Sequence, residues 1–139
     1  MFDDLTRPLR DFPNVSVKEG FLSQSEIGEL HAAHGVMLCP TRQDAQGVSM
    51  CEAMCSGLVP VTSRSSAIPE FVNHGMTGFL TNSSSEITEA LLALHRNAQL
   101  FSDMSARAAK SIREQCGIER IVGEEVAVMD RIVSAQNGH

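Results

Sequence analysis

Two short apolar runs most constrain what this chain can fold into. "VMLCP" covers residues 36–40 and "VPVTS" covers residues 59–63. Runs without a polar alternation are typical of strands that are covered by helices on both faces, as in parallel sheets. Parallel neighbours also need a crossover between them, which is usually helical. The sequence therefore predicts an α/β fold, a Rossmann-like parallel sheet flanked by helices, with 36–40 as a central strand.

Signals ahead of the first run predict a strand and a helix. The alternation in Asn14–Leu22 predicts a strand that ends at a glycine turn. Ser23 and Glu26 have the spacing of a capping box, which predicts a helix that continues to about His34. Gly35 is expected to stop that helix.

The segment between the two runs and the segment after them carry further signals. A helix is predicted over about Ser49–Ser56, closed by Gly57. After the second run we expect a short helix over 69–73 and a short edge strand over 77–80. A second capping-box spacing, over 83–86, opens the next helix.

Three apolar stripes at helical spacing predict three helices in the last third of the chain. We interpret these stripes as core-facing surfaces and not as cofactor contacts. They are Ile87, Ala90, Leu91 and Leu94; then Phe101, Met104, Ala108 and Ile112; then Val122, Val126, Met129 and Val133.

Composition and charge exclude several classes of function. A net charge of −6 argues against a large nonspecific nucleic-acid surface. No apolar run has the length of a membrane span, and the acidic start "MFDDL" lacks the core of an export signal. A cytoplasmic location is expected, with peripheral attachment to a membrane if the whole protein acts on a lipid-linked substrate.

The cysteines and histidines do not form a metal-binding pattern. The four cysteines contain no C-x-x-C pair and are expected to be reduced thiols. His31 and His34 share a helix face but have no third ligand close in sequence. No metal and no cofactor is therefore expected, and the chain also lacks a D-x-D motif.

Two loops leave the carboxyl ends of the predicted strands. They cover 40–49 and 63–69. In open parallel sheets ligands bind outside these strand ends, so both loops lie where a site is expected.

The first loop has the chemistry of a site for a phosphate joined to polyols. Gly47 permits close approach of the backbone, and the amides of Val48 and Ser49 at a helix start would bind an anion. Asp44 and Glu52 are good acceptors for neutral hydroxyls. A nucleotide sugar combines both kinds of group.

A purely structural interpretation of the same residues stays open. Ser49 and Glu52 have capping-box spacing, so Glu52 could only reach back to the Ser49 amide. Asp44 could be a turn former.

The segment Pro40–Leu80 resembles the donor-binding segment of the group-one retaining glycosyltransferases of GT-B fold, which include relatives of glycogen synthase and sucrose-phosphate synthase. Short motifs of that family recur in order and without large gaps. The matching residues are Pro40-Thr41, Glu52-Ala53-Met54, Gly57, Pro60-Val61, Pro69-Glu70, Gly75, Thr77-Gly78 and Leu80.

The resemblance implies roles for individual residues. Glu52 matches the second acid of the family's E-x7-E signature, which holds the donor ribose. Asp44 matches the first acid, which contacts the transferred sugar near the reacting centre and is therefore the candidate catalytic residue. Gly47, with the amides of Val48 and Ser49, matches the backbone that meets the sugar and the diphosphate.

Further contacts are implied more loosely, and the chain departs from the family at several positions. Leu22, after Phe21, matches a region that often contacts the base. The first acid is aspartate instead of glutamate, and Gln46 adds an amide that could bind the sugar. The glycine pair before Pro69 is replaced by Ser66-Ala67, which should stiffen that loop.

The resemblance also implies what the chain contributes to a larger enzyme. Residues 1–139 are expected to form one partial, C-terminal donor domain, without the N-terminal acceptor domain and without the cations that hold the diphosphate. The expected reaction is sugar transfer from a UDP- or GDP-sugar to an acceptor with retention, and this chain alone is expected to bind the donor weakly and to transfer nothing. A sheet edge left open would favour self-association.

Other classes of function are weighed against this one. A noncatalytic α/β binding or signalling domain could keep the scaffold without activity, and the departures at Asp44 and Ser66-Ala67 favour it. A receiver-type signalling domain would need an acidic cluster after its first strand, which is missing. A dinucleotide-binding enzyme would need G-x-G-x-x-G after a strand, which is also missing.

Overall fold

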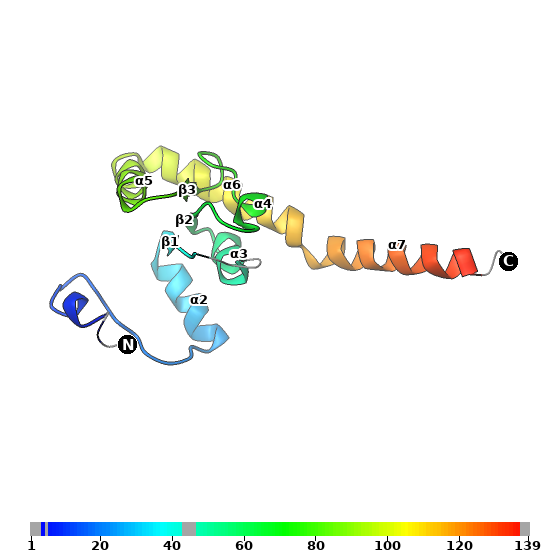
Figure 1. Cartoon of the computed structure of the whole chain (residues 1–139), viewed down its shortest axis with the longest axis horizontal. Helices are drawn as coiled ribbons and strands as arrows, with labels where there is room; N and C mark the ends of the chain where they lie inside the picture. Colours follow the sequence, from blue (N-terminus) through cyan, green and yellow to red (C-terminus); the bar gives the residue numbers. More distant parts are fainter. Residues whose placement is uncertain (1–3, 5, 43–46, 137–139) are drawn as a thin grey trace.

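The protein forms a parallel sheet that is flanked by helices, which confirms the predicted fold class (Figure 1). The computed structural model describes residues 4, 6–42 and 47–136. Three strands are described: β1 (Val36–Cys39), β2 (Val59–Ser63) and β3 (Phe79–Thr81). They lie in the order β1-β2-β3, and both neighbouring pairs are parallel.

The helices predicted over 23–34, 49–56 and 69–73 form within one or two residues of those bounds. The described helices are η1 (Arg7–Leu9), α2 (Gln24–Ala33), α3 (Val48–Cys55), α4 (Ile68–Phe71), α5 (Ser84–Arg96), α6 (Ala98–Cys116) and α7 (Ile118–Gln136). The capping box of α2 is confirmed, because the Ser23 hydroxyl accepts from the Glu26 amide and the Glu26 carboxylate accepts from the Ser23 amide. At α5 only half of the box forms, since the Glu86 carboxylate accepts from the amide of Asn82 instead of Ser83.

Side-chain hydroxyls link the carboxyl ends of the strands. Thr62 Oγ1 donates to the carbonyl of Cys39 at 2.8 Å, and Thr81 Oγ1 donates to the carbonyl of Thr62 at 2.9 Å. Each buried hydroxyl therefore spans two neighbouring strands, which holds fixed the edge from which the loops leave.

The core has two parts, and α6 contributes to both. One cluster joins α3, α4, β3 and α6, and the other joins β2, α5 and α6. Their buried members are Met50, Met54, Ile68, Val72, Leu80, Ala108 and Ile112, and then Val59, Val61, Ala90, Leu94 and Met104.

The prediction that 36–40 is a central strand is wrong. Within the described residues, β2 is the middle strand and β1 lies at an edge. Four of the five β2 residues are buried, whereas Leu38 of β1 is 48% exposed. The apolar run identified a strand correctly, but its place in the sheet depends on partners that a local pattern does not contain.

The strand predicted over 14–22 is also absent. This segment is irregular, and Gly20 makes the expected turn with a φ of +106°. A strand needs a hydrogen-bonded neighbour, and no described strand lies beside these residues. Arg10 instead forms an ion pair with Glu19 at the surface.

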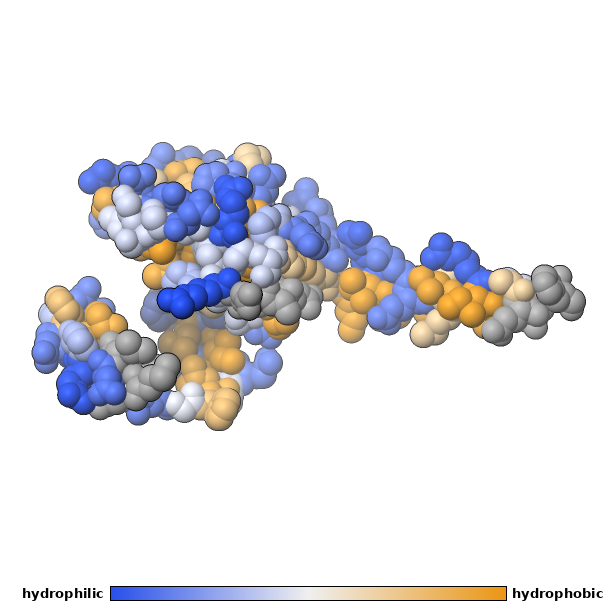
Figure 2. Space-filling view, viewed as in Figure 1, coloured by the Kyte–Doolittle hydropathy of each residue, from blue (hydrophilic) through white to orange (hydrophobic). Residues whose placement is uncertain are grey.

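The third predicted apolar stripe does not face a core. Val122 and Val126 are both 49% exposed, and Met129 and Val133 are still more exposed. Helix α7 runs away from the body of the molecule, and Figure 2 shows hydrophobic residues along its surface. None of the described helices has the length and apolar character that a membrane crossing requires.

Candidate functional site

The loop after β1 meets the segment after β2 at Gly47. This glycine is the N-cap of α3 and has a left-handed backbone, with φ +68° and ψ +46°. A Cβ atom here would lie 2.8 Å from Cδ1 of Ile68 and 3.3 Å from Cε of Met50. Both the backbone angle and the space therefore require glycine, which brings the start of α3 against α4.

The capping-box interpretation of Ser49 and Glu52 is wrong. Helix α3 begins at Val48, so Ser49 lies inside its first turn and not at the cap. The cap is a glycine in the left-handed region, which local spacing did not reveal. The Glu52 carboxylate is therefore not used to start the helix.

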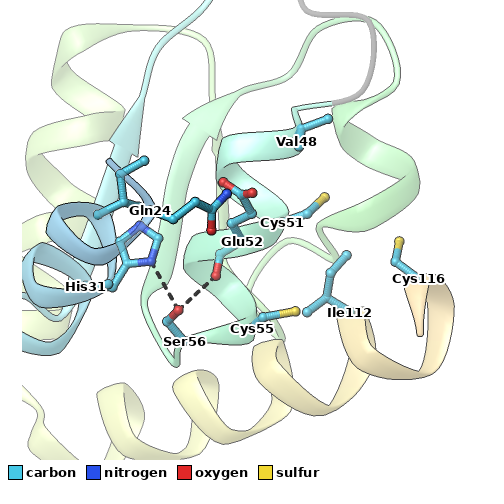
Figure 3. Close-up of a pocket in the computed structure, with 11 residues that line it drawn as sticks. Gln24, His31, Val48, Cys51, Glu52, Cys55, Ser56, Ile112 and Cys116 are labelled. Atoms are coloured by element: carbon cyan, nitrogen blue, oxygen red, sulfur yellow. Dashed lines mark hydrogen bonds between the residues drawn. The ribbon is translucent and has the colours of Figure 1, made fainter. Parts of the chain in front are cut away.

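Glu52 instead points into a hollow between α3 and α2. It lines a cavity of about 440 Å³ between α2, α3 and the end of α6, which Figure 3 shows from close by. It also lines a neighbouring cavity of about 390 Å³ between α2, β1 and α3. Ile27 and His31 line both cavities as well, so the two form adjoining parts of one groove.

The larger cavity is mostly apolar with a few polar groups. Three cysteines are among its lining residues, two from α3 and one from the end of α6. The full lining consists of Gln24, Ile27, Gly28, His31, Val48, Cys51, Glu52, Cys55, Ser56, Ile112 and Cys116. An apolar hollow with a few convergent polar groups is typical of small-molecule sites.

A hydrogen-bond chain connects α2 to α3 below Glu52. The Nδ1 atom of His31 lies 3.1 Å from Oγ of Ser56. Ser56 Oγ in turn donates to the main-chain carbonyl of Glu52 at 3.0 Å. Figure 3 shows both contacts as dashed lines.

The residues predicted from the sequence fall into three groups. Val48 and Glu52 line the larger cavity, and Ser49 lines the smaller one together with Glu52. Leu22 is half-buried just before the cap of α2 and lines neither cavity. Asp44 and Gln46 lie outside the described residues.

Sequence reasoning missed Gln24 and His31 of α2. They are seven residues apart, which is about two helical turns, and so lie on one face of the helix. On a helix without any buried residue, polar side chains at this spacing suggest a solvated face. This face of α2 lines a cavity only because α3 lies beside it.

The loop after β2 keeps a glycine-like backbone without glycine. Ser66 has φ +49°, which non-glycine residues adopt only at a cost. The hydroxyl of Ser63 lies close to those of Thr41 and Ser65, at 3.4 and 3.2 Å. A left-handed backbone thus occurs at a serine in this loop, and the stiffening expected from Ser66-Ala67 remains a prediction.

One described carboxylate, that of Glu26, has a shifted pKa for a structural reason. The pKa of Glu26 is lowered, first by the hydrogen bond from the Ser23 amide and then by the Ser23 hydroxyl. This reflects the helix cap and not catalysis. In the described part of the chain, no three or more His, Cys, Asp and Glu side chains are grouped so that they could hold a metal ion.

The sequence matches the family model described as "Glycosyl transferases group 1" over residues 5–97. The chain belongs to this family. It is 30% identical over 118 residues to the N-acetyl-alpha-D-glucosaminyl L-malate synthase of Bacillus anthracis, which covers 83% of this chain and 31% of that protein. It is 32% identical over 83 residues to the sulfoquinovosyl transferase SQD2 of Arabidopsis thaliana, which covers 58% of this chain and 16% of that protein.

Solved structures of glycosyltransferases share the fold. Sucrose-phosphate synthase of Thermosynechococcus elongatus superposes with a TM-score of 0.84 at 15% identity, over 96% of this chain and 34% of that one. The Anabaena protein HepE in complex with UDP-glucose gives 0.79 at 19% identity, over 94% of this chain and 36% of that one. The chain thus spans about a third or less of the length of these curated relatives.

Proposed function

We propose that this chain is the donor-binding part of a glycosyltransferase that transfers a sugar from a nucleotide sugar to an acceptor with retention. The observation that carries the proposal is the placement of Glu52. Its carboxylate enters a cavity beside α3, the helix whose Gly47-capped start faces the carboxyl edge of the sheet. The likeness to HepE, whose structure contains UDP-glucose, supports a nucleotide sugar as the ligand.

In this proposal Glu52 accepts hydrogen bonds from the donor ribose. An ionised carboxylate only accepts, so it suits a pair of hydroxyls better than a phosphate. The first amides of α3, from Val48 and Ser49, have no partner within the helix and take the diphosphate. Asp44 and Gln46, which precede Gly47 in the sequence, are assigned to the transferred sugar in this proposal.

The chemistry needs no nucleophile from the protein. In this proposal the acceptor hydroxyl oxygen bonds to C1 of the sugar on the side from which the diphosphate leaves. The bond between C1 and the diphosphate oxygen breaks, and the hydroxyl proton passes to the departing diphosphate. The leaving group is a UDP or GDP unit. No metal is required in this scheme, since the amides at the start of α3 and cations from the early part of the same donor domain stabilise the negative charge of the diphosphate.

The chain by itself binds the donor weakly and transfers nothing in this proposal. Its curated relatives are more than three times as long as the segment they share with it. The acceptor site and the cations that neutralise the diphosphate come from the part of the enzyme outside the shared segment. Donor binding, and not transfer, is therefore the activity to measure.

Titration of the ¹⁵N-labelled chain with UDP-glucose and GDP-mannose tests the proposal by NMR. Amide signals from Gly47 to Glu52 should shift with one of the two ligands, and Glu52→Ala should weaken binding about tenfold or more, since a charged hydrogen-bond acceptor is lost. Glu29→Ala, an exposed carboxylate of α2 outside the cavity, is the matched control. Unchanged signals with both ligands would reject donor binding and favour the noncatalytic alternative.

A further inference from the structure

A second polar side chain meets Glu52 in the larger cavity. Gln24 is the first residue of α2, and its carboxamide and the Glu52 carboxylate point toward one another from opposite walls (Figure 3). Neither side chain has a hydrogen-bond or ion-pair partner among the residues that the structure describes. Two polar groups from different helices thus converge in a mostly apolar hollow.

The two groups have complementary hydrogen-bonding capacity. The carboxylate accepts only, whereas the carboxamide has an NH₂ donor and a carbonyl acceptor. A vicinal diol fits both, because its two hydroxyls can donate to Glu52 while one of their oxygens accepts from the Gln24 NH₂. A phosphate would be repelled by the carboxylate, so the pair favours the sugar part of a nucleotide.

His31 holds α2 in the position that this arrangement requires. The Ser56 hydroxyl has one hydrogen, which it donates to the Glu52 carbonyl, so it must accept from Nδ1–H of His31. This contact fixes the ring tautomer and ties α2 to the main chain of Glu52. Because none of the ten residues of α2 is buried, such a tie contributes much to the placement of the helix.

We propose that Gln24 is a second ribose-binding residue, which donates to the hydroxyl pair accepted by Glu52, and that His31 is a positioning residue for Gln24. This inference rests on the proposed function, since it names the part of the donor that the same cavity takes. It adds a residue of α2 that binds through its side chain and that increases the preference for ribose over deoxyribose.

Binding of UDP and of 2′-deoxy-UDP to the full 139-residue chain, measured by NMR titration, tests the proposal. UDP should bind the unsubstituted chain more tightly than 2′-deoxy-UDP by about tenfold or more, because the deoxy ligand loses the 2′-hydroxyl contacts to both Glu52 and Gln24. Gln24→Ala should weaken UDP binding about five- to tenfold and 2′-deoxy-UDP binding much less, so that the preference falls to the part that the Glu52 carboxylate supplies. Gln99→Ala, an exposed glutamine of α6 that pairs with Asp103, should change neither affinity.

Gln24→Met separates hydrogen-bond donation from side-chain size and from folding. Methionine is a good helix former of similar length and adds no charge beside Glu52, so α2 should form normally. It cannot donate a hydrogen bond, so this variant should lower the ribose preference as Gln24→Ala does. A Gln24→Met chain that keeps the full preference would overturn the role of the NH₂ group.

His31 variants give a different signature from Gln24 variants. His31→Ala should weaken the binding of both UDP and 2′-deoxy-UDP and should speed hydrogen exchange of the α2 amides. His31→Asn keeps a donor near the position of Nδ1, so it should partly restore both the affinities and the slow exchange. If both Gln24 variants kept the affinities and the ribose preference of the unsubstituted chain while Glu52→Ala still weakened binding, the role of Gln24 would be rejected and the proposed function would stand. Failure of the unsubstituted chain to bind UDP would reject the proposed function together with it.

Discussion

Helices α6 and α7 carry the same kind of apolar stripe and end in opposite environments. Met104, Ala108 and Ile112 of α6 are fully buried. The equivalent positions of α7, such as Val126 and Met129, are about half exposed or more. Spacing therefore identifies the face of a helix that prefers to be covered, but it does not say what covers it.

The contacts of the two helices explain the difference. Side chains of α6 reach three other segments: Ser105 donates to the carbonyl of Gly57, Arg107 to that of Met76, and Arg113 to that of Cys55. The side-chain hydrogen bonds of α7 stay within α7 or reach the last turn of α6, as in the 3.1 Å contact from Arg120 to the Glu114 carbonyl. Helix α6 thus joins the core together, whereas α7 extends from it.

Truncation of one methionine in each helix should give the largest contrast. Met104→Ala should lower the free energy of unfolding by about 2–5 kcal/mol, because it leaves a cavity in the core. Met129→Ala, at a side chain that is 61% exposed, should change it by less than about 0.5 kcal/mol. Urea unfolding followed by circular dichroism measures both. Equal losses in the two variants would show that α7 is packed in solution.

Replacing a glycine by alanine should lower stability in the core and raise it in α7. A Cβ atom at Gly78 would lie 2.6 Å from the Pro60 carbonyl oxygen, so Gly78→Ala should cost about 1–3 kcal/mol through overpacking. At Gly123 of α7 nothing lies within 4 Å, and Gly123→Ala should add about 0.5–1 kcal/mol of helix propensity. Thermal unfolding measures the effect of Gly78→Ala, and the helical circular dichroism signal measures the effect of Gly123→Ala. A stabilised Gly78→Ala would contradict the close approach of β2 and β3.

The unpaired edge of β1 bears on whether two chains associate. We expect two chains to associate through this edge, since no described strand lies beside β1 opposite β2. The Val59 amide donates to the Gly35 carbonyl, and alternate residues of a parallel strand face its partner. Gly35, Met37 and Cys39 therefore face β2, and the Leu38 amide points away from it. Leu38→Pro removes that donor and should weaken association about tenfold in sedimentation velocity. A dimer of undiminished affinity in this variant would place the contact elsewhere.

The smallest expected effect concerns the cap of α2. Because the pKa of Glu26 is lowered in the folded state, its contribution to α2 is present above its ordinary pKa of 4.5 and is lost as the pH falls below that value. Hydrogen exchange of the α2 amides should therefore accelerate, after correction for intrinsic rates, between about pH 5 and 3. Glu26→Gln should abolish this pH dependence while the exchange of α6 stays unchanged. Identical pH profiles in both chains would contradict the role of the capping box.

The parts of the fold that local signals determine were predicted well. Strand β2 and the cap of α2 follow from their own residues, because burial on both faces and capping geometry leave clear patterns. The edge position of β1 and the exposure of α7 depend on neighbours far away in sequence or outside it. The same distinction holds in the site: Glu52 was found by spacing and resemblance, whereas Gln24 became visible only once α2 lay beside α3.

The outer edge of β3 has a consequence for how such chains can grow into larger assemblies. The Leu80 amide donates to Nδ1 of His74 at 3.0 Å, so an imidazole takes the hydrogen bond that a further strand would need. A sheet with one edge blocked and one edge open can add a partner only once. Association through β1 would then close on itself as a two-fold pair, and polymerisation into fibres by repeated strand addition would stop at the first step.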